Sequence, residues 1–298
     1  MTLLQPRALF LMCAPEHFAV TYTINPWMDP QRWSRDNRAL TAASRKEWRH
    51  LHRTMQDLGA EIELVPAVPG LPDLVFTANA AVVLDGKALL AHFRHAERQA
   101  EEPHYEAAFC ALKDRGLISS VSKLPDGIVL EGAGDCVWDP ARNHFWMGYG
   151  QRSDADARAV VEREFGVDVV ALELADARFY HIDTALRPLP RGEMIYYPNA
   201  FTAAGRAEIR KRVPAEKRIE IKFEDARLLA ANAVSIDESI MLSRCGKALR
   251  ADIERTGYRV VTTPLGAFLR SGGSAFCLTL RLDTRSAGAR AEVDIAAA

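Results

Sequence analysis

The stretch GIVLEGAGDCVWDPARNHFWMGYGQRSDADARAVVEREFGVDVVAL, residues 127–172, contains one complete structural pattern. Apolar side chains gather at Gly127–Glu131 and again at Phe145–Gly148, which is typical of two short strands. They then recur at three-and-four spacing over Asp154–Phe165, which predicts an amphipathic helix, before a third strand-like run at Val167–Leu172. The stretch therefore predicts the order strand, strand, helix, strand.

The same order recurs along the chain, because helix-like runs return about every 50 residues with two or three strand-like runs between them. The other helix-like runs are Thr41–Leu58, His104–Arg115, Thr202–Val213 and Gly246–Thr256. The other strand-like runs are Ala8–Met12, Ile62–Val65, Ala80–Leu84, Ala88–His92, Ile182–Leu186, Met194–Tyr197, Ile219–Phe223, Ser235–Leu242, Arg259–Thr263 and Phe276–Leu282. A doubly wound sheet would alternate single strands with single helices. The excess of strands instead predicts an α/β fold of similar modules around a centre, as in a propeller.

No linker rich in Pro, Gly or Ser divides the chain, so residues 1–283 are expected to form a single domain. Residues 284–298 are small, polar and Ala-rich without apolar periodicity, and we expect a flexible C-terminal tail there.

Charge and hydropathy exclude several classes of protein. The 298 residues include 38 Lys and Arg against 39 Asp and Glu, a net charge of −1, which disfavours binding to nucleic acid or to a membrane surface. No apolar run reaches the about 18–20 residues that span a bilayer, and Leu9–Met12 makes a poor signal peptide. We therefore expect a cytoplasmic protein, and a homo-oligomer is compatible with the sequence.

The cysteines number five and show no CxxC spacing, so they are expected to be reduced thiols; they are Cys13, Cys110, Cys136, Cys245 and Cys277. Most free cysteines are buried apolar residues. Cys277 differs because it follows a Gly-Gly-Ser turn at the expected start of a strand, where backbone can approach a ligand and a nucleophile can be presented. A core cysteine in the last strand is the alternative.

Several polar residues are candidates for a site. His181 and Asp183 alternate along an expected strand and would share one face, either as a base with its orienting carboxylate or as an exposed polar face. Glu131 ends a strand before a Gly turn, in a segment that lacks the third glycine of a dinucleotide fingerprint. Asn25 and Asn79 could be ordinary turn residues. No histidine stands at zinc-ligand spacing, and no phosphate-binding loop is present, so we expect neither a metal nor a cofactor.

The spacing of these candidates favours the functional interpretation. Asn25, Asn79, Glu131, His181, Asn232 and Cys277 are separated by 54, 52, 50, 51 and 45 residues. If each module has about that length, equivalent loops would bring one polar residue apiece to a central pocket.

Four motifs together resemble the guanidine-modifying, or pentein, superfamily: FTAN (Phe76–Asn79), EGAGD (Glu131–Asp135), HIDT (His181–Thr184) and GGSAFC (Gly272–Cys277). The resemblance implies a five-module α/β propeller and spans almost the whole chain. The segments MCAPEHF (Met12–Phe18) and INPWM (Ile24–Met28) are most similar to the arginine dihydrolases, which convert arginine to ornithine, ammonia and carbon dioxide.

The resemblance also implies a role for each candidate. Cys277 would be the nucleophile and His181 the general acid and base, while Glu131 and Asp183 would hold the guanidinium. Arg98 and Arg152 match positions that hold the substrate carboxylate, with Arg94 a competitor for the first. The partner is then a small molecule, arginine or a close guanidino analogue.

Asn79 distinguishes the subfamilies, because deiminases have a carboxylate at the matching position. An amide offers both a donor and an acceptor, as a neutral ureido group requires, so we expect a second hydrolysis, with Asn25 as a further contact. The alternatives within this chemistry are a dimethylarginine dimethylaminohydrolase, a deiminase and an amidinotransferase. A non-catalytic binding member of the same fold and a zinc hydrolase are the alternatives of other kinds.

Overall fold

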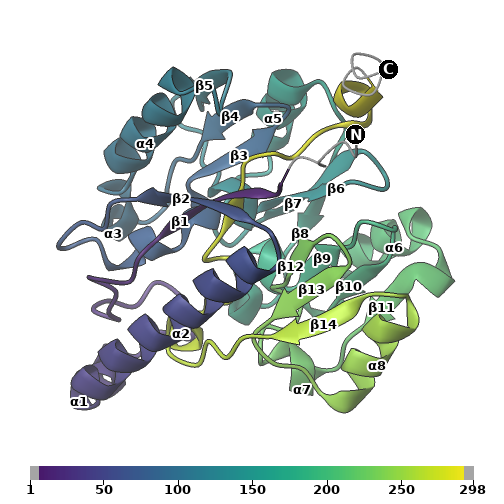
Figure 1. Ribbon diagram of the computed structural model, residues 1–298. Helices are drawn as coiled ribbons and strands as arrows, with labels where there is room; N and C mark the ends of the chain where they lie inside the picture. Colours follow the sequence, from purple (N-terminus) through teal and green to yellow (C-terminus); the bar gives the residue numbers. More distant parts are fainter. Residues whose placement is uncertain (1–6, 292–298) are drawn as a thin grey trace, which may run out of the picture.

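The computed structural model describes residues 7–291, which form five three-stranded sheets around a common centre (Figure 1). In every sheet the middle strand pairs antiparallel with one neighbour and parallel with the other. The sheets are β15 (Leu280–Arg281), β1 (Leu9–Cys13) and β2 (Glu61–Val65); β3 (Ala81–Leu84), β4 (Lys87–Leu90) and β5 (Ser120–Lys123); β6 (Cys136–Asp139), β7 (His144–Tyr149) and β8 (Val169–Glu173); β9 (Leu186–Pro188), β10 (Met194–Tyr196) and β11 (Arg218–Glu220); and β12 (Val234–Ile236), β13 (Ser239–Leu242) and β14 (Arg259–Thr262).

A helix connects the two parallel strands of each sheet, as such a connection requires. The helices are α1 (Pro30–Arg35), α2 (Asn37–Asp57), α3 (Ala96–Gln99), α4 (Glu102–Asp114), α5 (Ala157–Phe165), α6 (Ala203–Arg212), α7 (Phe223–Ala226) and α8 (Lys247–Arg255). The module order strand, strand, helix, strand and the five-module α/β propeller are thus confirmed. The ring closes because β1, near the N-terminus, pairs with β15, near the C-terminus.

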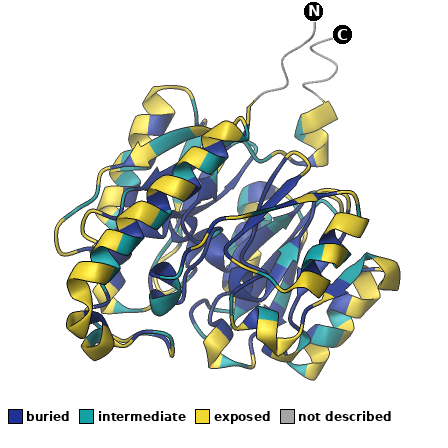
Figure 2. Ribbon diagram, turned by 60° about the horizontal axis from the view of Figure 1, so that its bottom comes forward, coloured by how far each residue is buried: buried dark blue, intermediate teal, exposed yellow. Residues whose placement is uncertain are grey.

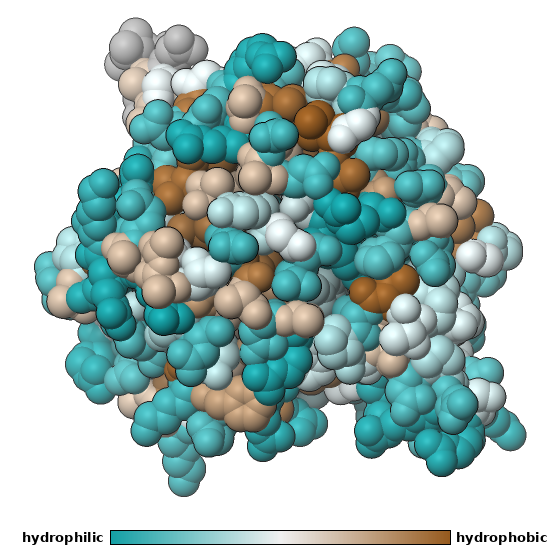
Figure 3. All heavy atoms as spheres, turned by 180° about the vertical axis from the view of Figure 1, so that it is seen from behind, coloured by the Kyte–Doolittle hydropathy of each residue, from teal (hydrophilic) through white to brown (hydrophobic). Residues whose placement is uncertain are grey.

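The core lies between neighbouring modules, and the helices cover its outside. Figure 2 shows dark blue strands inside and helices whose outer faces are yellow. In α2 the buried residues Trp48, Leu51 and Met55 recur every three or four positions, so one stripe faces the core. Figure 3 shows mainly hydrophilic residues over one face, with apolar atoms in separate patches. Among residues 7–291 no helix combines the length and the apolar character needed to cross a membrane.

Several expected strands are wrong or shorter than predicted. Ser235–Leu242 is a hairpin formed by β12 and β13, and only the first two residues of Ile219–Phe223 belong to β11, because α7 begins at Phe223. Gly127–Glu131 contributes only the bridge between Leu130 and His92, and Phe276–Leu282 contributes only Leu280–Arg281. Ile182–Leu186 begins as the 3₁₀ helix Ile182–Thr184, so His181 and Asp183 do not alternate along a strand. Comparable 3₁₀ turns precede β3 and β6, at Thr77–Asn79 and Gly132–Gly134. Their apolar residues are buried as in strands, but the backbone turns and brings the neighbouring polar side chains toward the centre.

Part of the segment expected as a tail makes specific contacts. The backbone N–H of Ser286 donates to Asp85 Oδ1 at 2.7 Å, and that of Ala287 donates to Asn143 Oδ1 at 2.6 Å. The remaining residues of the expected tail, 292–298, lie outside the described residues.

Candidate active site

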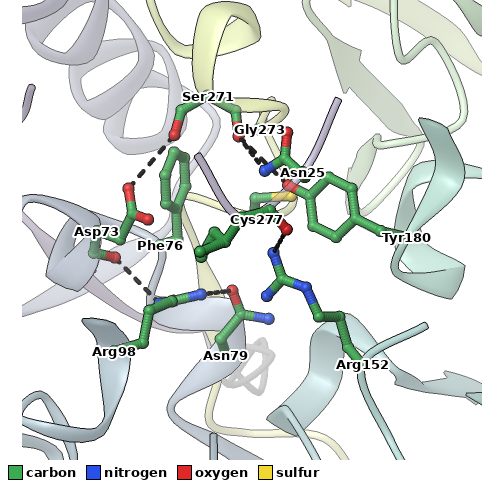
Figure 4. Close-up of a pocket in the computed structure, with 11 residues that line it drawn as sticks. Asn25, Asp73, Phe76, Asn79, Arg98, Arg152, Tyr180, Ser271, Gly273 and Cys277 are labelled. Atoms are coloured by element: carbon green, nitrogen blue, oxygen red, sulfur yellow. Dashed lines mark hydrogen bonds between the residues drawn. The ribbon is translucent and has the colours of Figure 1, made fainter. Parts of the chain in front are cut away.

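A narrow pocket opens at the centre of the ring, where loops of the modules meet (Figure 4). Its free space is about 10 Å³, roughly the room of one water molecule. It is lined by Ile24, Asn25, Asp73, Phe76, Asn79, Arg98, Arg152, Tyr180, Ser271, Gly273 and Cys277. Arginine needs more room than this, so residues that line the pocket must move to admit a ligand of that size.

Cys277 lies in a turn three residues before β15 and is 4% exposed. Its Sγ donates to Asp183 Oδ2 at 3.2 Å and accepts a hydrogen bond from Asn232 Nδ2 at 3.1 Å. Burial raises the pKa of the Cys277 thiol well above its usual range, and the nearby Asp183 raises it further. The thiol is therefore protonated in this state. A glycine is needed at position 273, where the backbone passes close to the ring of Phe76: a Cβ there would lie 2.2 Å from that ring.

Asp183 is buried beside this thiol, at the turn after His181. Burial raises its pKa to about 7, although hydrogen bonds from Cys277 and Asn232 oppose the rise. Its second oxygen, Oδ1, has no hydrogen-bond partner among the described residues. A buried carboxylate with a spare oxygen is well suited to bind a cation.

His181 forms a second charged group with Glu131 and Arg152. Glu131 Oε2 lies 2.7 Å from His181 Nε2 and 2.8 Å from Arg152 Nη1, and all three side chains are buried. Burial alone would raise the pKa of Glu131, but Arg152 and His181 outweigh it and hold that pKa well below its usual range. Glu131 is thus ionised and able to orient the imidazole.

Asp135 is buried next to this group and holds its backbone in place. It accepts hydrogen bonds from Ser153 Oγ at 2.7 Å and from the backbone N–H of Ile182 at 3.0 Å. The second bond holds the turn that carries His181 and Asp183. Burial raises the pKa of Asp135 to about 6.

Of the other residues expected at the site, Asn25 and Arg98 line the pocket and Arg94 does not. Asn25 lines the pocket and donates from Nδ2 to the Ser271 carbonyl at 3.0 Å. Arg98 also lines the pocket. Arg94 does not: its Nη2 pairs with Asp154 at 2.5 Å, and its side chain is 39% exposed. Of the two competing arginines, the structure therefore places Arg98 at the pocket.

The residues expected at a common centre are brought together from positions far apart in the sequence. Asn25, Asn79, Arg98, Arg152 and Cys277 line the pocket. Glu131, Asp183 and Asn232 are buried in direct contact with those lining residues, and His181 is buried against Glu131 and against Tyr180, which also lines the pocket.

Sequence reasoning missed Asp73, Tyr180 and Ser271. Tyr180 adjoins His181, which was a usable signal, and its ring stacks with the Arg152 guanidinium at 4.7 Å. Asp73 lies in the 3₁₀ helix Pro72–Val75 and Ser271 ends the 3₁₀ helix Phe268–Ser271, directly before the GGSAFC motif, which was a usable signal for Ser271 only. Nothing in residues 7–291 groups three or more His, Cys, Asp or Glu side chains as a metal site would require.

Residues 14–283 match the family model described as "N,N dimethylarginine dimethylhydrolase, eukaryotic". The chain belongs to this family. The match places it in the pentein superfamily, in agreement with the five-module fold and with the four motifs.

Two curated relatives indicate different activities. A bifunctional arginine dihydrolase/ornithine cyclodeaminase, ArgZ of Synechocystis sp., is 41% identical over 91% of this chain but only 37% of its own length. The dimethylarginine dimethylaminohydrolase of Mycobacterium tuberculosis is 34% identical over 92% of this chain and 85% of its own length. The chain therefore spans little more than a third of the cyanobacterial relative.

A solved structure of the N-terminal domain of ArgZ, described as an arginine dihydrolase from cyanobacteria with substrate bound, is also similar. It superposes with a TM-score of 0.87 at 38% identity, covering 93% of this chain and 99% of that domain. The similarity thus extends over the whole N-terminal domain of that relative.

Proposed function

We propose that this protein is a cysteine-dependent hydrolase that converts free arginine to ornithine, two ammonia and carbon dioxide. The observation that carries the proposal is the Cys277 thiol that donates to Asp183, two residues after His181, whose imidazole pairs with Glu131; the amide of Asn79 lines the same pocket as Cys277. The similarity to the arginine dihydrolase domain of ArgZ supports the choice of arginine. The cysteines of the described chain are all free, which favours the reducing cytoplasm, and residues 1–283 are proposed to act as one catalytic domain.

Binding begins with the cationic guanidinium, which Asp183 and Glu131 hold through charge-assisted hydrogen bonds. Arg152, and the one N–H of Arg98 that its protein partners leave free, are proposed to hold the substrate carboxylate. A bound cation beside Cys277 lowers the pKa of the thiol, because positive charge stabilises the thiolate.

Chemistry then proceeds by covalent catalysis. The Cys277 thiolate attacks the guanidinium carbon, and protonated His181 donates its proton to the departing nitrogen, which leaves as ammonia. An amidino-thioether remains on Cys277. His181 next removes a proton from water, the water oxygen adds to the same carbon, and the carbon–sulfur bond breaks to give citrulline.

The second round uses the same groups on the neutral ureido carbon. Cys277 displaces the second ammonia to form a thiocarbamate, water releases a carbamate, and the carbamate loses carbon dioxide to leave ornithine. Asn79 is proposed to donate a hydrogen bond to the ureido oxygen. The two rounds consume two waters, so atoms and charge balance.

A dimethylarginine dimethylaminohydrolase is the second candidate, since the family model and the mycobacterial relative both carry that description. Such an enzyme would release dimethylamine and citrulline in a single round. Asp183 favours arginine, because two methyl groups on the nitrogen would remove the N–H donors that its carboxylate accepts.

Product analysis tests the proposal. Arginine should yield one ornithine and two ammonia per turnover, whereas dimethylarginine should react far more slowly. Cys277→Ala should lose activity, and Cys110→Ala, which removes an exposed free thiol on α4, should not. Accumulation of citrulline with a single ammonia would contradict the dihydrolase assignment, and an active Cys277→Ala variant would contradict the mechanism.

A further inference from the structure

Glu101 is a fully buried acid outside the pocket, and the reaction steps above do not use it. It follows the short helix α3, and its carboxylate is occupied by Arg98 of that helix. Arg98 Nε donates to Glu101 Oε1 at 3.0 Å, and Arg98 Nη2 donates to Oε2 at 2.8 Å. Two parallel bonds of this kind fix the plane of a guanidinium.

The rest of the Arg98 guanidinium reaches toward the pocket. Nη2 also donates to the Asp73 carbonyl at 3.2 Å, and Nη1 donates to Asn79 Oδ1 at 2.8 Å. The Phe93 ring lies 4.4 Å from the guanidinium carbon. Four of its five N–H groups are therefore used within the protein, and the guanidinium has little freedom to rotate.

This contact determines which way the amide of Asn79 faces. Arginine only donates hydrogen bonds, so the atom of Asn79 that meets Arg98 must be the oxygen. The amide nitrogen donates to the Glu131 carbonyl at 3.0 Å. A Cβ built on Gly134 would lie 2.2 Å from that nitrogen and 3.3 Å from His181 Nδ1, so the nitrogen is on the His181 side.

Donor orientation has different consequences for the two successive substrates. A guanidinium presents only N–H groups at its reacting end, so an amide N–H facing it gains no hydrogen bond. A ureido group presents a carbonyl oxygen, which accepts one. An Asn79 held as a donor therefore favours the second substrate over the first.

We propose that Glu101 is a positioning residue that, through Arg98, holds Asn79 as a hydrogen-bond donor and so commits the ureido intermediate to the second hydrolysis. The inference rests on the proposed two-round function. Without the second charge-assisted bond, Arg98 can rotate, and the amide of Asn79 can turn its oxygen toward the pocket.

The test is Glu101→Gln, which keeps the size of the side chain but removes its charge and one acceptor. Any loss through Arg98 and the substrate carboxylate is common to arginine and citrulline, so kcat/KM with citrulline as substrate should fall about tenfold more than kcat/KM for arginine consumption. Arginine reactions should then accumulate citrulline. Glu97→Gln makes the same change on the exposed side of α3 and should leave both substrates unaffected. Glu101→Asp, which retains the charge, should recover part of the citrulline activity.

Equal fractional losses for both substrates would leave the ratio of the two kcat/KM values unchanged. That outcome would show that Glu101 is merely structural and would overturn the inference. If Glu101→Gln fails to fold, Glu101→Asp provides the comparison: its shorter side chain retains the charge but weakens the two-bond contact with Arg98, so it should show the same selective loss in weaker form, and an unchanged ratio there overturns the inference too. A wild-type protein that never hydrolyses citrulline would instead disprove the proposed function, so the two failures are distinguishable.

Discussion

At the scale of single residues, Asp183 shows a conflict between binding and stability. Its carboxylate is buried with one oxygen unpartnered, and burial raises its pKa from 3.8 to about 7. The folded state therefore holds a proton that the unfolded chain releases near pH 4. As the pH rises from about 4 to 7 the folded state loses stability relative to the unfolded one, and the loss is complete above about pH 7.

We accordingly expect the free energy of unfolding of Asp183→Asn at pH 8 to exceed that of wild type by about 2 kcal/mol, so the variant should unfold at a higher temperature. The gain should shrink as the pH falls from about 7 to 4 and vanish below about pH 3, where the carboxyl is neutral in both states. Activity should fall more than about a hundredfold, because the cation loses its counter-charge. Thermal unfolding across pH measures the gain, with exposed Asp126→Asn as control. A pH-independent difference would contradict the assigned cause.

At the scale of elements, the segment before α1 covers the pocket. Asn25 holds it to the Ser271 carbonyl, the backbone N–H of Trp27 donates to Asn25 Oδ1, and the indole N–H of Trp27 donates to the Arg178 carbonyl at 2.7 Å. Arg152 Nη2 also donates to the Ile24 carbonyl at 3.0 Å, so the hydrogen bonds from Asn25, Trp27 and Arg152 hold this segment over the pocket.

Trp27→Phe should raise KM for arginine about fivefold with little change in kcat, because one hydrogen bond that holds the closed cover, worth about 1 kcal/mol, is lost. Steady-state kinetics measure the effect. Trp33→Phe in the neighbouring α1 is the matched control, since the Trp33 indole N–H has no hydrogen-bond partner among the described residues. A lower kcat at constant KM in Trp27→Phe would refute this role.

The elements also show what the sequence could and could not predict. The expected helices agree to within a few residues with α2, α4, α5, α6 and α8. A long run of apolar residues at three-and-four spacing is typical of an amphipathic helix and of no other element. The 3₁₀ helix Ile182–Thr184, by contrast, lies inside the predicted strand Ile182–Leu186. A short buried apolar run has the same composition in either conformation, and only the surrounding modules decide between them.

The site divides in the same way. Cys277 and Glu131 stand beside glycines in recognisable motifs and were expected at the pocket. Glu101 could not be predicted, because its proposed role depends on a two-bond ion pair with Arg98, which lies three residues earlier on the four-residue helix α3. Such a contact depends on side-chain geometry that periodicity does not encode.

At the scale of the whole molecule, the segment after β15 ties two modules together. Besides the contacts of Ser286 and Ala287, Arg290 Nη2 donates to the Pro140 carbonyl at 3.1 Å. Ending the chain after Asp283 should lower the unfolding temperature by about 3 °C while kcat/KM stays within about twofold. Calorimetry and arginine assays of the two chains provide the comparison. An unchanged unfolding temperature would mean that these contacts contribute nothing in solution.

Pairing of β1 with β15 also matters while the chain is being synthesised. Glu131 and Asp183, the carboxylates proposed to bind the guanidinium, emerge from the ribosome well before residue 277, and β1 cannot pair with β15 until residues 280–281 have been added. A partly made chain can therefore contain a place for a guanidinium but no sulfur to attack it. The residues that close the ring and Cys277, the proposed nucleophile, are added within a few residues of each other, so under the proposed mechanism reactivity appears only in a chain that is able to complete its fold.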